Sequence, residues 1–158
     1  EGGGEVWMPL LSKHTEVIRL DVSGATGLAD HAVRHVLALS SLTALNISGC
    51  SSITDAALAH VGRLGSLKML KMESLPKLSD HGLTHLRPLT GLQWISIAGC
   101  QALGAVSFAV LVEIGQEGGE GGLRHLCARG CRLLVSSVRS ERTRPRPCQL
   151  EPRLRVKF

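Results

Sequence analysis

Apolar and polar residues alternate along the chain in one pattern that returns at nearly constant intervals. Its fullest copy is Leu42–Leu58, LTALNISGCSSITDAAL, in which a short alternating stretch is followed by a helical spacing of apolar residues. Further copies begin at Val17, Leu67, Leu92 and Leu123, so the intervals between copies are 25, 25, 25 and 31 residues. A period in this range indicates that the chain stacks copies of one supersecondary unit.

The opening residues of each copy have the period of two that is typical of a β-strand. Two apolar positions in each copy are expected to point into the core, and the residues beside them are expected to point outward. The inward pairs are Leu20 and Val22, Leu45 and Ile47, Leu70 and Met72, and Ile95 and Ile97. Four copies place a glycine where the strand should turn, at Gly24, Gly49, Gly99 and Gly130.

A helix is predicted after each strand, because apolar residues then recur at i and i+3 and form one buried stripe. In the first three copies the helix should begin at Asp30, Asp55 and Asp80, whose charge favours the helix N-terminus by about 0.3–1 kcal/mol each. Thr54 and Ser79, one residue earlier, are good N-cap residues. The predicted stripe is Val33 and Val36, Leu58 and Val61, Leu83 and Leu86, and Phe108 and Leu111.

The last two copies depart from this plan. Gly104 and Ala105 stand where the earlier copies have a cap residue and an acid. The apolar run Ala102–Ile114 is too short to span a membrane and indicates a buried helix. The glycine-rich insert Gly115–Gly122 predicts a mobile loop, whose closure costs little entropy. The fifth copy has a strand near Leu123 but no clear helix.

The copies divide the 158-residue chain into three parts. Residues 1–16 form an N-terminal flank or the remnant of an upstream repeat, and residues 17–134 form the repeat domain. Residues 135–158 form a tail that we expect to be disordered, because it is rich in proline and arginine. The whole chain has a net charge of +5. Counting charged residues assigns that excess to the tail, so the residues that precede the tail are neutral when taken together. The first residues contain no secretory signal.

Five cysteines occur, an odd number. Cys50, Cys100 and Cys131 occupy the same position in their copies, which indicates a packing position and not a disulfide framework. Cys127 and Cys148 lie outside that position. We therefore expect reduced thiols in a cytoplasmic protein, with the nucleus as the other compartment that fits.

The motif L-x-x-L-x-[LI]-x-x-C followed by I-T-D-x-x-L is complete in Leu42–Leu58, and its first half recurs in Leu92–Cys100 and Leu123–Cys131. It resembles the cysteine-containing subclass of leucine-rich repeats, as in F-box/leucine-rich-repeat proteins. The resemblance implies an α/β leucine-rich-repeat fold, a right-handed solenoid or horseshoe segment. Its parallel sheet would be concave and its helices would lie on the convex side. It also implies that the repeated cysteine is buried beside the turn.

In such a fold the outward-facing strand residues line the concave face. One column, Arg19, Ala44, Met69, Trp94 and His125, places a methionine beside an outward-facing tryptophan. Tryptophan and arginine often dominate binding energies, and methionine suits adaptable surfaces. The alternative is that Trp94 covers a gap at the edge of an incomplete solenoid. The predicted partner-binding residues are Arg19, Asp21, Asn46, Met69, Lys71, Glu73, Trp94, Ser96, His125 and Arg129.

Histidines also recur in register, at His31 and His81 and at His35, His60 and His85. A spacing of i, i+4 on a helix is typical of metal ligands. However, both positions fall on the outer face of the predicted helix, and zinc needs four ligands at about 2 Å. We therefore predict solvated histidines and no metal site.

Catalysis finds no support in the pattern. His125 and Cys127 lie two residues apart on one strand, a separation of about 7 Å. This distance is too long for the hydrogen bond that a nucleophile needs to its general base. The glycines form neither a phosphate-binding loop nor a dinucleotide fingerprint. We therefore predict that the protein is not an enzyme and that it uses no cofactor.

These observations predict a non-catalytic interaction module or scaffold that binds a protein partner on its concave face, with no small-molecule substrate and no membrane contact. One alternative is a substrate-recognition fragment of an F-box type ubiquitin-ligase receptor, a ubiquitin-ligase adaptor. Another is a nucleic-acid-associated protein that acts through the Arg-rich tail, with salt-dependent binding. Nucleic acid is the less favoured partner, because no aromatic residues are interleaved with the basic ones to stack on bases, and Phe158 stands alone at the end of the tail.

Overall fold

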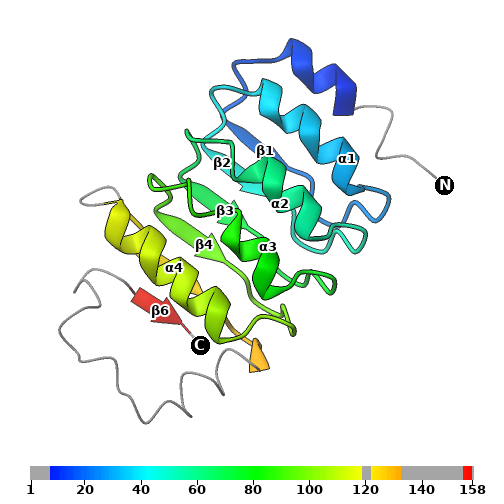
Figure 1. Ribbon diagram of the computed structural model, residues 1–158. Coiled ribbons are helices and arrows are strands. Elements are labelled where there is room, and N and C mark those ends of the chain that lie inside the picture. The colour runs from blue at the N-terminus through cyan, green and yellow to red at the C-terminus, as the bar shows by residue number, and fades with distance from the viewer. Residues whose placement is uncertain (1–7, 119–121, 133–154, 158) are drawn as a thin grey trace, which may run out of the picture.

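The computed structural model describes residues 8–118, 122–132 and 155–157. They form a six-stranded parallel sheet in the order β1-β2-β3-β4-β5-β6, and Figure 1 shows the helices side by side over one face of it. The strands are β1 (Arg19–Asp21), β2 (Ala44–Asn46), β3 (Met69–Lys71), β4 (Trp94–Ser96), β5 (His125–Cys127) and β6 (Arg155–Lys157). The helices are α1 (Asp30–Val33), α2 (Asp55–Val61), α3 (Asp80–Thr84) and α4 (Ala105–Glu117), with 3-10 helices η1 (Met8–Lys13) and η2 (Arg34–Ala38).

The predicted inward row of strand residues is confirmed by the sheet register. Leu45 pairs with Leu20 on one side and with Leu70 on the other, and Ile95 continues the row to Leu126. All of these side chains are buried except Leu20, which is only half-buried. Leu20 lies on β1, the edge strand of the described sheet, so only one neighbouring strand covers it. Each strand–helix unit therefore buries its apolar face against the next unit, as stacked repeats do.

Side chains at the starts of the helices join consecutive units. The carboxylate of Asp30 accepts hydrogen bonds from the backbone nitrogen of Thr54 at 2.7 Å and from its hydroxyl at 2.6 Å. Asp55 holds Ser79 one unit later in the same way. Thr54 and Ser79 also cap their own helices, as predicted. We call Asp30, Asp55 and Asp80 the carboxylate ladder, because each reaches the helix start of the next unit.

The last member of the ladder, Asp80, changes how α4 packs. It accepts hydrogen bonds from the backbone nitrogen of Gly104 at 2.7 Å and from the hydroxyl of Ser107. Ser107 is thereby fully buried at the start of α4, and Phe108 beside it is only half-buried. The predicted buried stripe is met only in part at Phe108, which packs half-buried against the core while Ser107 takes the fully buried position. It is correct at Val33, Val36, Leu58, Val61, Leu83, Leu86 and Leu111, which are all buried.

Helix α4 is longer than the sequence predicts. It continues to Glu117, so Gly115 and the two residues after it are helical and not part of a loop. The helix ends at Gly118, whose backbone nitrogen donates to the Ile114 carbonyl at 3.3 Å. A Cβ at Gly118 would lie 2.2 Å from the Thr90 carbonyl oxygen, so only glycine permits this close approach. In the rest of the predicted loop, residues 119–121 lie outside the described residues, and Gly122 is described.

Both ends of the chain differ in part from expectation. Within the predicted flank, the structure contains η1, which packs beside η2. Within the tail expected to be disordered, Arg155–Lys157 forms β6 and pairs with β5. Residues 133–154 and 158 lie outside the described residues, so the predicted nucleic-acid contact through the tail stays a prediction. No helix in the described ranges is long and apolar enough to cross a membrane.

The repeated cysteines are packing residues, as predicted. Cys50, Cys100 and Cys131 are fully buried. Their thiols donate to the carbonyls of Val22 at 3.2 Å, Met72 at 3.0 Å and Ile97 at 3.0 Å, each in the preceding unit. Burial raises the pKa of the Cys100 thiol to about 11 and also raises the pKa values of Cys50 and Cys131. With Cys127 they are free thiols, and Cys148 lies outside the described residues.

Candidate functional site

The sheet face opposite the helices carries the predicted partner-binding residues, and we call it the open face. The predicted column across it is confirmed by the register: Arg19 pairs with Ala44, Ala44 with Met69, Met69 with Trp94, and Trp94 with His125. A second row beside the column contains Asp21, Asn46, Lys71, Ser96 and Cys127. The equal register of five strands thus brings side chains that lie 25 or 31 residues apart in the sequence next to each other.

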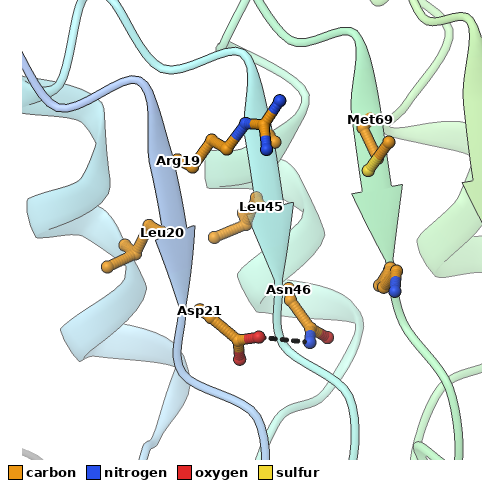
Figure 2. A pocket seen from close by; sticks show the side chains of 8 residues that line it. Arg19, Leu20, Asp21, Leu45, Asn46 and Met69 are labelled. Carbon is orange, nitrogen blue, oxygen red and sulfur yellow. Dashed lines mark hydrogen bonds between the residues drawn. The ribbon is translucent and has the colours of Figure 1, made fainter.

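A groove of about 240 Å³ lies in the open face over β1, β2 and β3 (Figure 2). Its position follows from side-chain size, because the methyl group of Ala44 stands between the long side chains of Arg19 and Met69. Met69 is 39% exposed, which is high for a large apolar side chain. The groove is lined by Arg19, Leu20, Asp21, Ala44, Leu45, Asn46, Met69 and Lys71.

Hydrogen bonds fix the polar end of this groove. The Asp21 carboxylate accepts from the hydroxyl and backbone nitrogen of Ser23 at 2.7 and 2.9 Å, and from the Asn46 amide nitrogen at 2.9 Å. Figure 2 shows Asp21 and Asn46 joined at the ends of β1 and β2. The Asn46 amide oxygen accepts in turn from the Ser48 backbone nitrogen at 3.1 Å. These hydrogen bonds lower the pKa of Asp21. The largest effect comes from the Ser23 hydroxyl, followed by the Ser23 backbone and Asn46, and the positive charge of Lys71 adds a smaller one.

The polar chain continues across β3 and β4. The Ser48 hydroxyl accepts from the backbone nitrogen of Glu73 at 3.1 Å, and the Ser96 hydroxyl donates to the Glu73 carboxylate at 2.6 Å. Ser96 itself is fully buried. It therefore positions Glu73 on this face and offers no surface of its own to a partner. Strand alternation alone does not reveal that Ser96 is buried.

Trp94 lies under a cation. The Lys71 ammonium stands 5.4 Å from the centroid of the Trp94 ring, within the range of a cation–π interaction worth about 0.5–1 kcal/mol at an exposed site. Trp94 is half-buried, and its neighbour in the column, Met69, is the more exposed of the two. Strand alternation predicts Lys71 and Trp94 on one face. Their contact follows from the register, because Met69 pairs with Trp94 and Lys71, two residues further along β3, is the diagonal neighbour of Trp94.

The remaining predicted site residues lie at the far end of the open face. His125 on β5 and Arg129 beyond it are exposed, and Cys127 is half-buried. The face therefore combines the basic residues Arg19, Lys71 and Arg129 with two carboxylates that accept hydrogen bonds from neighbouring units.

The repeated histidines lie on the helix side of the molecule. His31 and His81 are exposed, and His35, His60 and His85 are half-buried. The rings of His81 and His85 meet edge to face with centroids 5.4 Å apart. Across residues 8–118, 122–132 and 155–157, no group of three or more His, Cys, Asp or Glu side chains is placed to hold a metal ion.

Comparisons with known proteins show the fold and not the family. No protein-family model matches the chain, and no curated protein matches it. Sixteen chains of solved structures match. One belongs to the crystal structure of the Rad7 and Elc1 complex in yeast, with a TM-score of 0.60 and 16% sequence identity. The match covers 89% of this chain but 32% of that chain, so this chain spans about a third of that protein's length. The chain thus has an α/β fold of the leucine-rich-repeat kind, with parallel strands and helices in sequence order.

Proposed function

We propose that this chain is a non-catalytic interaction module that binds a partner protein through its open face. In this proposal the stacked units form a right-handed horseshoe segment, and the open face is its concave side. The free thiols of Cys50, Cys100, Cys127 and Cys131 suit a reducing compartment such as the cytoplasm or nucleus.

The column around Ala44 is the observation that carries the proposal. It holds the exposed Met69 beside Trp94, with Arg19 on the far side of Ala44, and these side-chain types supply much of the energy in protein interfaces. The polar residues next to it are held by hydrogen bonds between neighbouring strands. A partner would therefore meet a surface whose polar side chains are already ordered, which reduces the entropy lost on binding.

The proposal is tested by substituting Trp94 and measuring binding and folding separately. Trp94→Ala should abolish capture of a partner identified with the full chain, while the thermal unfolding midpoint stays near that of the unchanged protein. Arg63→Ala, at an exposed position after α2, is the matched control and should bind normally. If Trp94→Ala unfolds the protein instead, Trp94 is a packing residue that covers a gap in the solenoid, and the proposed role of Trp94 fails.

A narrower role is the substrate-recognition part of an F-box type ubiquitin-ligase receptor. It is supported by the repeat resemblance, with Cys50 and Leu58 completing the motif, and by the likeness to a chain that was solved within a protein complex. Co-purification of ubiquitin-ligase subunits with the full-length gene product tests this role. A partner that binds the open face without any ligase subunit would leave the general proposal and remove the narrower one.

A further inference from the structure

The charges that line the groove at Ala44 are unequally engaged. The Asp21 carboxylate accepts three hydrogen bonds and lies near the positive charge of Lys71. Lys71 also stands over the Trp94 ring. In contrast, the exposed side chain of Arg19 makes no hydrogen bond or ion pair with any other residue in the described part of the chain. The guanidinium is therefore the charged group of this groove that, in the described part of the chain, neither a hydrogen bond nor a ring contact engages.

The position of Arg19 sets which part of a ligand it could reach. Figure 2 shows its side chain extending from β1 toward β2, where Ala44 is its register partner. A guanidinium presents a planar set of donors that matches a carboxylate in a two-point contact. A carboxylate bound there would lie beside the recess over Ala44.

The recess itself favours an apolar group. Ala44 contributes only a methyl group, and the exposed thioether of Met69 forms the wall on the β3 side. Methionine adapts its shape to different apolar side chains. The neighbouring Asn46 is held at the edge of the recess, because its amide nitrogen donates to Asp21 and its amide oxygen accepts from the Ser48 backbone.

We propose that this groove recognises an extended segment of a partner protein in which an acidic side chain lies next to an aliphatic one. The aspartate or glutamate pairs with Arg19, and the aliphatic side chain fills the recess over Ala44 against Met69. This inference rests on the proposed function of the open face and names the chemistry of its partner.

A library of random twelve-residue peptides, displayed with amidated or fused ends and selected on the full chain, tests the inference. The selected peptides should share Asp or Glu within about two positions of Leu, Ile, Val or Met. For one such peptide, measured by fluorescence polarisation, Glu→Gln should weaken binding about tenfold or more, and so should Arg19→Glu in the protein. A peptide with Glu→Lys should recover part of its binding to the Arg19→Glu variant, which a merely structural role of Arg19 would not produce.

The recess is tested by Ala44→Leu, with Ala44→Met as a second variant should the first unfold. Either should weaken the same peptide about tenfold by filling the recess, with an unchanged unfolding midpoint. Arg63→Glu, on the helix side, is the control for charge and should have no effect. Peptides that need Trp94 but tolerate both Arg19→Glu and Ala44→Leu would overturn the inference and leave the proposed function intact. Peptides whose binding is unchanged by Trp94→Ala, Arg19→Glu and Ala44→Leu would overturn the inference as well. So would a selection that enriches no acidic residue, or one that enriches no peptide at all.

Discussion

The carboxylate of Asp55 binds Ser79 in the next strand–helix unit, accepting hydrogen bonds from its backbone nitrogen at 2.8 Å and from its hydroxyl. The Ser79 hydroxyl in turn accepts from the backbone nitrogen of His81 at 3.2 Å. One acidic side chain therefore fixes the residue that caps the following helix. Because hydrogen bonds to an ionised group are stronger than neutral ones, this contact should contribute to holding the units in register.

Asp55→Ala is expected to lower the free energy of unfolding by about 2–3 kcal/mol, because it leaves the half-buried Ser79 without its charged acceptor. Urea unfolding at neutral pH measures the change. Glu113→Ala is the control: Glu113 pairs with Arg87 at 2.9 Å, but both are exposed, so its loss should cost under about 1 kcal/mol. Equal effects of the two substitutions would show that the ladder contributes no more than a surface ion pair.

Gly82→Ala should destabilise the protein although alanine is the better helix former. A Cβ at Gly82 would lie 2.3 Å from an Asp55 carboxylate oxygen, so the carboxylate would have to leave its place beside Ser79. Helix propensity alone would favour alanine by about 1 kcal/mol. Gly65→Ala is the matched control, because nothing lies within 4 Å of its Cβ position, and it should be neutral. A gain in thermal stability for Gly82→Ala would contradict the ladder.

The sequence predicted the register of this fold better than the contacts that secure it. A constant interval is enough to align Leu45 with Leu70, because equal units must stack in equal register. For Asp55, the sequence predicted only that its charge favours the N-terminus of its own helix. Its bond to Ser79 depends on where two side chains meet between units, and no pattern within one unit encodes that meeting.

The open face shows the same limit. Strand alternation placed Ser96 and Trp94 outward, and both lie on the predicted face. Their burial depends on the lengths of neighbouring side chains, so Ser96 is covered and Trp94 is half-buried under Lys71. The groove likewise arises because Ala44 is short between two long residues, a property visible in the sequence once the register is known.

The inward row allows a comparison at two depths of burial. Leu45→Ala and Leu70→Ala should each lower the free energy of unfolding by about 2–5 kcal/mol, because both side chains are buried. Leu20 occupies the same row position but is half-buried on the edge strand. Leu20→Ala should therefore lower the free energy of unfolding by less. Denaturant unfolding of the three variants measures the order. A cost for Leu20→Ala as large as that for Leu70→Ala would mean that the edge is covered.

The cysteine thiols predict how stability depends on pH. Because the pKa of Cys100 is raised from 9.0 to about 11, the folded state keeps its proton at pH values where the unfolded chain releases it. Stability from this group is thus complete below pH 9 and is lost as the pH rises toward 11. Unfolding measured between pH 8 and 11 should show this loss, and Cys100→Ala should reduce it. An identical pH slope in that variant would contradict the assignment.

Thiol reactivity provides a separate check on the same burial. Iodoacetamide at pH 8 should modify the half-buried Cys127 well before Cys50, Cys100 and Cys131, because the thiolate is the reactive form and burial suppresses it. Mass spectrometry of the peptides gives the order of modification. Early modification of Cys100 would mean that its unit opens in solution.

The binding role of the open face is tested most directly by site-specific photo-crosslinking. Benzoylphenylalanine placed at Met69, on the open face, and separately at Ala59, exposed on α2, reports which side of the molecule a partner touches. We expect a covalent product with the partner from position 69 and none from position 59. A product from position 59 alone would place the partner on the helices and rule out binding through the open face.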